Sequence, residues 1–397
     1  IDSIHGIFIG EVYQSKISNS DSVHNALSKS INDKVFPELS VDIIGVMKNG
    51  DSFFKPIGFS SVGLTDKVYI VNKLIGEKYI ESVEKPRLEK DYLQNKLTPF
   101  AKVANMGYQD LKLSPETLFD RHLIAVGATN SGKSTTSLSI LDKLVSDGKK
   151  VLIIDPTGEY ENSFNETNVK RLTLGVDTVL DTGQVSFSQW ATLFETNDST
   201  QPAVLADAIK SLRFQRKNNE DGVYKKNGKT IFDVEQDMFS LGPDETTFDL
   251  SLLPSQISEE AVEADRSMQR YQIGAFQFNN KQWLVQKVSY KLENVRLREF
   301  FGDKSGKVDL IEDVKSFMED RIHSLYINTS EIGVGEGIGS MIIDLLSNFI
   351  INKKQKDNIA FVMFIDEVHR YAKDINSGGF QTGLTSIARE GKKKGVF

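Results

Sequence analysis

The chain has 397 residues, of which 39% are hydrophobic and 26% charged, so it is long enough for two or three domains of the ordinary soluble globular kind. It contains no cysteine, which excludes a disulfide framework and a thiolate metal site, and its five histidines are too scattered for a zinc site. A net charge of −7 excludes a generally basic nucleic-acid coat, although it permits a local basic surface.

The opening residues, IDSIHGIFIGEVYQ, lack the basic start and the long apolar core of a signal peptide. No apolar run approaches the length of a membrane span. Together with the lack of cysteine, this favours a cytoplasmic protein without a membrane partner. Because the sequence has no initiator Met and stops at GKKKGVF, we expect it to be a fragment of a longer chain.

Residues 1–85 alternate between apolar and polar side chains in four segments, HGIFIGEVY, VDIIGVM, SFFKPIGF and KVYIVNKL. Turn signals separate the segments, and the strongest is Asn49-Gly50, because both residues tolerate the positive φ of a tight hairpin. This pattern predicts a small N-terminal β-barrel over residues 1–85. The charged stretch that follows, with Pro86 and Pro99, predicts a connector over residues 86–120.

From residue 121 onward, the strand pattern changes to runs that are apolar throughout: LIAV (123–126), VLIID (151–155), SLYINT (324–329) and AFVMFID (360–366). Such runs are typical of parallel strands buried on both faces, and helical patterns lie between them. We therefore predict an α/β domain with a parallel sheet over residues 121–397. Amphipathic stretches between about 188 and 320 predict a mainly helical insertion.

The segment GATNSGKST matches the phosphate-binding loop in full, with an apolar run before it and a helical pattern after it. Its glycines let backbone N–H groups converge on phosphates, and the N-terminus of the following helix favours negative charge. We expect Lys133 to reach the β- and γ-phosphates and Ser134 to bind Mg²⁺. The expected nucleotide-binding residues are consecutive: Gly127, Ala128, Thr129, Asn130, Ser131, Gly132, Lys133, Ser134 and Thr135.

A second motif, FVMFIDEVHRY, places Asp366 and Glu367 directly after a buried strand, at the edge of the sheet where ligands gather. We expect Asp366 to hold Mg²⁺ through water and Glu367 to polarise the attacking water, so the two motifs together predict hydrolysis. ATP is favoured over GTP because the sequence has no Asn-Lys-x-Asp motif. DEVH also resembles the acidic motif of superfamily 2 helicases. In those proteins, however, the phosphate-binding loop and the acidic motif lie much closer together in sequence than Lys133 and Asp366 do.

Five segments together resemble the HerA branch of the HerA/FtsK ATPases: DRHLIAVGATNSGKS, VLIIDPTGEY, LYINTSEIG, FIDEVHRY and SIAREGKKKG. An N-terminal barrel and a helical insertion fit this family as well. The resemblance implies a RecA-like P-loop ATPase core that uses ATP and Mg²⁺, assembled as a hexameric ring that translocates double-stranded DNA through its channel. It also implies a partner effector, either a nuclease or a sirtuin-like protein, in DNA processing or anti-phage defence.

The same resemblance assigns roles to two arginines. Arg121 aligns with the arginine that family members point into a neighbouring subunit's ATP site, where a fixed cation stabilises charge on the γ-phosphate. Arg389 falls in the family's second arginine region, and Lys392 stands where an arginine is usual. Asp155 and Glu159, in DPTGEY, have two open interpretations: a catalytic or Mg²⁺-binding role, or a turn that Asp155 stabilises.

Two functions stay open at this point. In the first, ATP hydrolysis pulls duplex DNA through a hexamer. In the second, the ring is a scaffold that assembles and activates a partner effector with ATP merely bound. The family continues past GKKKGVF into a segment that braces the ring, so we expect stable hexamers to depend on that segment. DNA contact has the weakest support, since the three lysines at 392–394 are either phosphate contacts or a solvated charge run.

Overall fold

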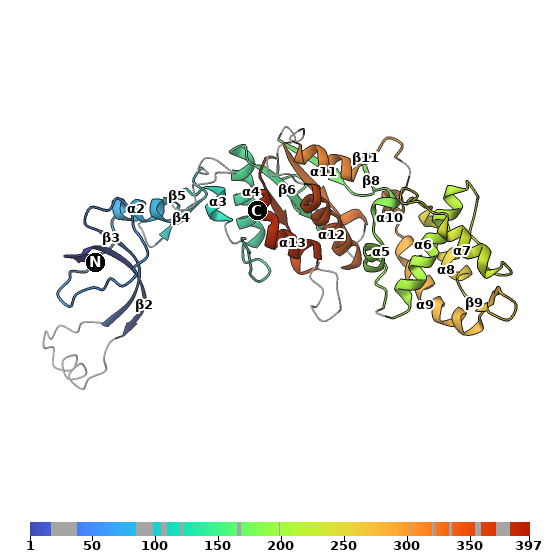
Figure 1. Cartoon of the computed structure of the whole chain (residues 1–397). Coiled ribbons are helices and arrows are strands. Elements are labelled where there is room, and N and C mark those ends of the chain that lie inside the picture. Colours follow the sequence, from blue (N-terminus) through green and yellow to red (C-terminus); the bar gives the residue numbers. More distant parts are fainter. Residues whose placement is uncertain are drawn as a thin grey trace, which may run out of the picture. The chain divides into compact units, whose positions relative to one another are not determined.

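The computed structural model describes residues 1–16, 38–84, 98–104, 109–119, 122–164, 168–197, 199–302, 304–319, 321, 323–332, 336–353, 359–370 and 382–397. The chain divides into two compact units, Ile1–Leu118 and Phe119–Phe397 (Figure 1). Among the described residues, none of the helices combines the length and the apolar composition that crossing a bilayer requires.

The first unit is built on an antiparallel sheet with the strand order β1-β2-β3. Its strands are Asp2–Ser3 (β1), Gly6–Lys16 (β2) and Glu38–Lys48 (β3), and a helix follows at Lys73–Glu84 (α2). Ile9 of β2 and Met47 of β3 form a small buried core with Phe54. Tyr79 of α2 packs edge-on against Phe54 with the ring centroids 5.8 Å apart, so α2 covers this core.

The expected N-terminal barrel is not confirmed, because within the described residues only the first two of its four predicted segments form long strands. The third segment contributes a single bridge, between Val46 and Lys55. Pro56 follows at once and has no N–H with which to extend the ladder. The fourth segment runs into α2, since the Asn72 side chain accepts a hydrogen bond from the Ile75 N–H (2.9 Å) and caps the helix.

The stretch expected to be a connector, residues 86–120, carries regular structure in its described part. A short antiparallel pair joins Ala101–Val103 (β4) to Gln109–Leu111 (β5), and one helical turn follows at Pro115–Leu118 (α3). The Ser114 hydroxyl accepts a hydrogen bond from the Thr117 N–H (3.3 Å), which is the N-cap contact that a serine before a proline predicts.

The second unit contains the parallel sheet that the sequence predicts, with the strand order β13-β6-β12-β7. Its strands are Lys150–Asp155 (β6), Val169–Thr173 (β7), Ser324–Asn328 (β12) and Phe361–Ile365 (β13), and every neighbouring pair is parallel. All residues of β6 and β12 are buried, in keeping with their continuous apolar runs. Because β6 and β13 are neighbours, the polar residues that follow these two strands meet at one edge of the sheet.

Three helices of this unit flank the sheet: Lys133–Ser146 (α4), Glu336–Lys353 (α12) and Thr382–Glu390 (α13). α4 is the helix predicted after the phosphate-binding loop, and its C-terminal half is buried through Leu141, Leu144 and Val145. α12 contacts α13 on one side and a helix of the insertion on the other, and a short turn at Gly391–Lys394 (η7) follows α13.

Residues 123–126 do not form the strand that their apolar run predicts. Leu123, Ile124 and Val126 are 47%, 74% and 84% exposed. The outer edge of β13 is paired instead with the end of the described chain, where the Met363 N–H donates to the Phe397 carbonyl (2.8 Å). A strand needs a hydrogen-bonded neighbour, and residues 123–126 pair with no strand among the described residues.

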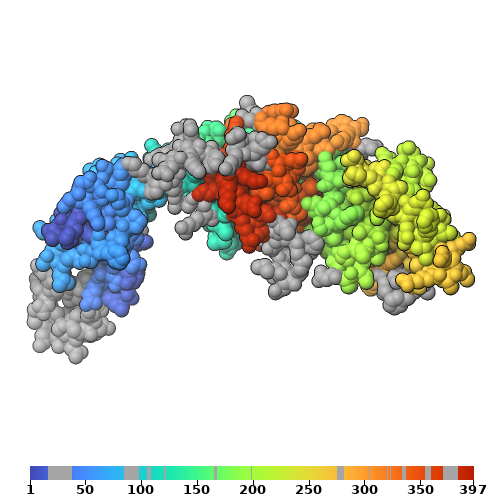
Figure 2. Space-filling model, viewed as in Figure 1, coloured from blue at the N-terminus to red at the C-terminus, as the bar shows by residue number. Residues whose placement is uncertain are grey.

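Helices dominate between residues 187 and 318, where the sequence predicts the insertion (Figure 1). In Figure 2 these residues, coloured from green to orange, form a continuous surface beside the red C-terminal part of the same unit. The elements are Phe187–Leu193 (α5), Gln201–Lys217 (α6), Ile231–Phe239 (α7), Leu250–Leu252 (η4), Leu253–Glu259 (α8), Val262–Asp265 (β9), Arg270–Ile273 (β10), Ala275–Leu292 (α9), Val295–Phe300 (α10) and Leu310–Met318 (α11). A two-strand parallel pair, Thr178–Val179 (β8) with Val308–Asp309 (β11), and a turn at Thr182–Gln184 (η3) border it.

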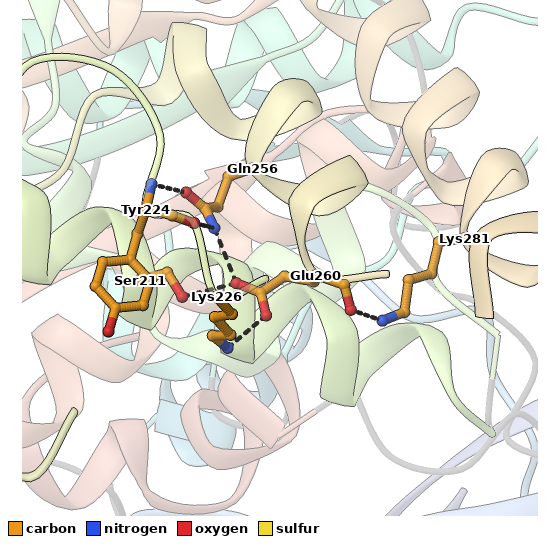
Figure 3. A network of polar contacts seen from close by, with 6 residues as sticks. All are labelled: Ser211, Tyr224, Lys226, Gln256, Glu260 and Lys281. Atoms are coloured by element: carbon orange, nitrogen blue, oxygen red, sulfur yellow. Dashed lines mark hydrogen bonds and ion pairs between the residues drawn. The ribbon is translucent and has the colours of Figure 1, made fainter. Parts of the chain in front are cut away.

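A buried polar network joins three of these helices (Figure 3). Its centre is the Glu260 carboxylate after α8, which accepts hydrogen bonds from Ser211 of α6 (2.7 Å) and Gln256 of α8 (2.9 Å). Lys226, from the loop after α6, pairs with the second carboxylate oxygen. Lys281 of α9 donates to the backbone carbonyl of Glu260, so one residue links α6, α8 and α9.

Candidate nucleotide-binding site

The loop before α4 turns tightly, and its residue types explain why it can. Gly132 has φ 90° and Asn130 has φ 63°, values that glycine and asparagine adopt with less strain than other residues. A Cβ added at Gly127 would lie 2.2 Å from the Ser131 Oγ, so any larger residue would push Ser131 aside. The Ser131 N–H donates to the Ala128 carbonyl (3.1 Å) and closes the turn.

The loop leads into the N-terminus of α4, which is available to an anion. Lys133 is the first residue of α4, and within the described part of the chain no side chain caps this helix end. The first N–H groups of an uncapped helix, together with the helix dipole, attract negative charge. Residues 127–132, Ser134 and Thr135 are exposed and Lys133 is half-buried, so the whole segment 127–135 is accessible to a phosphate group.

Asp366 and Glu367 follow β13 directly. The Asp366 N–H donates to the Ile154 carbonyl (3.0 Å) and fixes the end of β13 beside the end of β6. Burial raises the pKa of Asp366, and the carboxylates of Asp155, Glu367 and Glu159 raise it further by repulsion. The folded site therefore disfavours the ionised form of Asp366, and a bound cation would relieve that repulsion.

The backbone of Glu367 is strained. Its φ is 47°, in the left-handed region that a glutamate rarely adopts. Strain of this kind is held where surrounding structure enforces it and is concentrated at functional sites. The Glu367 Oε2 lies 3.2 Å from the His369 Nδ1, and its side chain is 26% exposed, so the carboxylate stays within reach of solvent.

Asp155 is fully buried, and its hydrogen bonds are those of a turn. Its Oδ1 accepts from the N–H and hydroxyl of Thr157 (both 2.8 Å) and from the Gly158 N–H (2.9 Å). Its Oδ2 accepts from the Tyr160 N–H (3.0 Å) and the Tyr326 hydroxyl (2.8 Å). Five donors satisfy both oxygens, so the contacts favour the interpretation of Asp155 as the residue that stabilises the turn.

Glu159, on the same turn, faces the phosphate-binding loop. The Ser134 hydroxyl donates to the Glu159 Oε2 at 3.4 Å. Ser134, Glu159 and Asp366 thus supply a hydroxyl and carboxylate oxygens, the ligand types that Mg²⁺ prefers. Among the described residues no three His, Cys, Asp or Glu side chains form a complete metal cage. This donor set therefore fits a Mg²⁺ that keeps waters and shares the phosphates of a nucleotide.

The remaining predicted site residues are the arginines and a lysine. Arg121 lies outside the described residues. Arg389 is exposed near the end of α13, and Lys392 is exposed on η7. The Lys394 side chain donates to the Ile351 carbonyl of α12, so the last lysine of the run holds η7 in place. The roles of Arg121, Arg389 and Lys392 stay predictions.

Tyr160 directly follows Glu159 and lies next to the candidate site, but the sequence interpretation did not include it, although it stands in the DPTGEY segment. Its side chain is 2% exposed and packs edge-on against Phe364 of β13, with the ring centroids 5.8 Å apart. An aromatic residue directly after Glu159 was the available signal. Its contact with β13 depends on the strand order, which no local pattern in the sequence reveals.

Comparison with known proteins gives a family match. The family model described as "Helicase HerA, central domain" matches residues 100–332, more than half of the chain. The DNA double-strand break repair helicase HerA of Sulfolobus acidocaldarius is 26% identical over 304 residues, which are 72% of this chain and 51% of that protein. The chain therefore spans about half the length of this curated relative.

Two solved structures show a more distant likeness. The first is VirB4 of Thermoanaerobacter pseudethanolicus, with a TM-score of 0.47 at 12% identity over 76% of each chain. The second is the plasmid coupling protein TrwB in complex with the ATP analogue ADPNP, with a TM-score of 0.46 at 14% identity over 85% of this chain and 73% of TrwB.

Proposed function

The chain belongs to the family of the helicase HerA central domain, and from that premise we propose that it binds ATP with Mg²⁺ and hydrolyses it. The observation that carries the proposal is the meeting of two motifs at one sheet edge. Ser134, at the start of α4, lies within 3.4 Å of Glu159 after β6, and Asp366 after β13 repels that same glutamate. The loop that would bind phosphates and the carboxylates that would bind a cation therefore lie at the same edge of the sheet.

In this proposal each part of the site has one task. The N–H groups at the start of α4 and the Lys133 ammonium hold the phosphates. Ser134 and Asp366 hold Mg²⁺, which supplies charge neutralisation on the phosphate oxygens. Glu367, strained and accessible, orients and deprotonates the attacking water. Asp155 acts only through the turn that presents Glu159.

We further propose that this hydrolysis moves double-stranded DNA through a ring of identical subunits, in which Arg121 of one subunit stabilises the γ-phosphate in the ATP site of the next. The support is the family membership and the relative named as a DNA double-strand break repair helicase. RecA-like architecture of the core, a hexameric ring and an effector partner, either a nuclease or a sirtuin-like protein, belong to the same proposal.

The test compares Lys133→Ala and Glu367→Gln with Lys143→Ala, a lysine near the other end of α4. Binding of a fluorescent ATP analogue and ATP hydrolysis are measured, with and without long duplex DNA. We expect Lys133→Ala to lose binding, Glu367→Gln to bind without hydrolysis, and Lys143→Ala to match the wild type. ATP binding unaffected by Lys133→Ala would refute the site. Hydrolysis that duplex DNA does not stimulate would refute the translocase and leave an ATP-dependent scaffold.

A further inference from the structure

The Tyr160 hydroxyl is a buried polar group that lacks a well-formed hydrogen bond among the described residues. The residue is 2% exposed, and its hydroxyl oxygen has no hydrogen bond of acceptable geometry among the described residues. Its backbone is fixed, because the Tyr160 N–H donates to the Asp155 Oδ2 (3.0 Å). Its ring is fixed as well, by edge-on packing against Phe364. Leaving a buried hydroxyl unpaired is costly, so such a group usually has a ligand or a second state in which it is paired.

This hydroxyl lies beside the residues proposed to bind the cation. Tyr160 directly follows Glu159, and its ring packs against Phe364 of β13. Phe364 stands two positions before Asp366, and positions two apart along a strand lie on the same face. The Asp366 carboxylate helps to raise the pKa of Tyr160, after burial, and the nearby Ser134 hydroxyl lowers it. A tyrosine hydroxyl carries a proton at physiological pH and can donate a hydrogen bond. Ser134 is engaged with Glu159 at 3.4 Å, a long hydrogen bond that a stronger ligand would displace.

We propose that Tyr160 is a positioning residue, whose hydroxyl donates a hydrogen bond to the Asp366 carboxylate when nucleotide and Mg²⁺ occupy the site. This inference rests on the proposed function. A hydrogen bond to one carboxylate oxygen orients the group and leaves the second oxygen for the cation or its water. Groups that hold metal-binding side chains in this way affect metal affinity by about 10–100-fold.

Tyr160→Phe tests the proposal, because it removes the hydroxyl and keeps the ring against Phe364. The measurement is a Mg²⁺ titration of fluorescent ATP-analogue binding, with a parallel measurement in EDTA. We expect the Mg²⁺ concentration at half-saturation to rise about 10-fold or more, with nucleotide affinity in EDTA unchanged. In an Asp366→Ala background, Tyr160→Phe should cause no further change, because the side chain that accepts its hydrogen bond is gone.

Tyr326→Phe is the matched control. Tyr326 is also buried, but its hydroxyl donates to the Asp155 Oδ2 at 2.8 Å, so its loss should lower the thermal unfolding midpoint and leave the Mg²⁺ titration unchanged. Tyr160→Phe should show the opposite pattern, with an unfolding midpoint no lower than that of the wild type. A Tyr160→Phe titration that superimposes on the wild type would overturn the inference. A wild-type protein whose nucleotide binding ignores Mg²⁺ would instead overturn the proposed function.

Discussion

The buried pair between Lys226 and Glu260 permits a sharp test of what holds the insertion together (Figure 3). The two side chains are 10% and 4% exposed, so neither charge is solvated when its partner is removed. Glu260→Gln keeps the size of the side chain but removes the carboxylate that pairs with Lys226, while Lys281 keeps its bond to the backbone carbonyl of residue 260. Breaking a buried pair in this way costs about 3–5 kcal/mol of unfolding free energy.

The two halves of the pair are not equivalent. After Lys226→Met, the Glu260 carboxylate still accepts from Ser211 (2.7 Å) and Gln256 (2.9 Å), and Lys281 still offers a positive charge. We therefore expect Lys226→Met to cost less than Glu260→Gln. The double variant removes both charges, so it should lose less stability than the sum of the single variants by more than about 1 kcal/mol.

Urea unfolding followed by tryptophan fluorescence measures these differences. Trp190 of α5 is fully buried in the main hydrophobic core and Trp283 of α9 is 69% exposed, so the change in fluorescence reports mainly on that core. Hydrogen exchange in α6, α8 and α9 locates the loss, because these are the helices that Glu260 joins. Strictly additive variants, or a Glu260→Gln cost below about 1 kcal/mol, would show that the pair is solvated and refute the reasoning.

Two further predictions concern a glycine and a buried lysine. Gly132→Ala forces alanine to φ 90°, a strain of about 1–3 kcal/mol, so binding of the ATP analogue should weaken about 10-fold. Gly148→Ala is the control, because Gly148 has φ 71° at the other end of α4. This control should lower the free energy of unfolding and leave binding of the ATP analogue unchanged. Burial lowers the pKa of Lys281 from 10.5, so between the lowered value and 10.5 the unfolded chain binds more protons than the folded one. The free energy of unfolding should therefore rise with pH between the lowered pKa and 10.5. Lys281→Met removes the titrating group, so it should flatten this part of a plot of the urea midpoint against pH.

The local form of the loop could be predicted because it depends on consecutive residues. Gly127, Gly132 and Lys133 stand in one short segment, and the structure gives Gly132 a positive φ before α4 begins at Lys133. The nucleotide-binding role of these residues stays a prediction. Strands β6, β12 and β13 were predictable for a related reason, since a continuous apolar run requires burial on both faces.

The errors come from partners that are distant in sequence. An apolar run such as 123–126 predicts a strand, but it does not show which strand it would pair with. In the structure, β13 pairs with the residues around Val396 and not with residues 123–126. In the first unit, Asn72 offers a helix cap that a strand pattern does not reveal. Glu260 and Lys226 look like ordinary surface residues in the sequence, because the helices α6, α8 and α9 that surround them are brought together only by the fold.

The turn after β6 explains why one acidic residue of the site is structural and its neighbours are available for chemistry. Asp155 has five donors, so its charge is compensated within the protein. Glu159 has the Ser134 hydroxyl at 3.4 Å, and Asp366 is left with a raised pKa beside other carboxylates. The same turn that satisfies Asp155 therefore places uncompensated negative charge at the start of α4. A cation that binds there would relieve the repulsion between these carboxylates and attract the phosphates of a nucleotide, so we expect each ligand to strengthen the binding of the other.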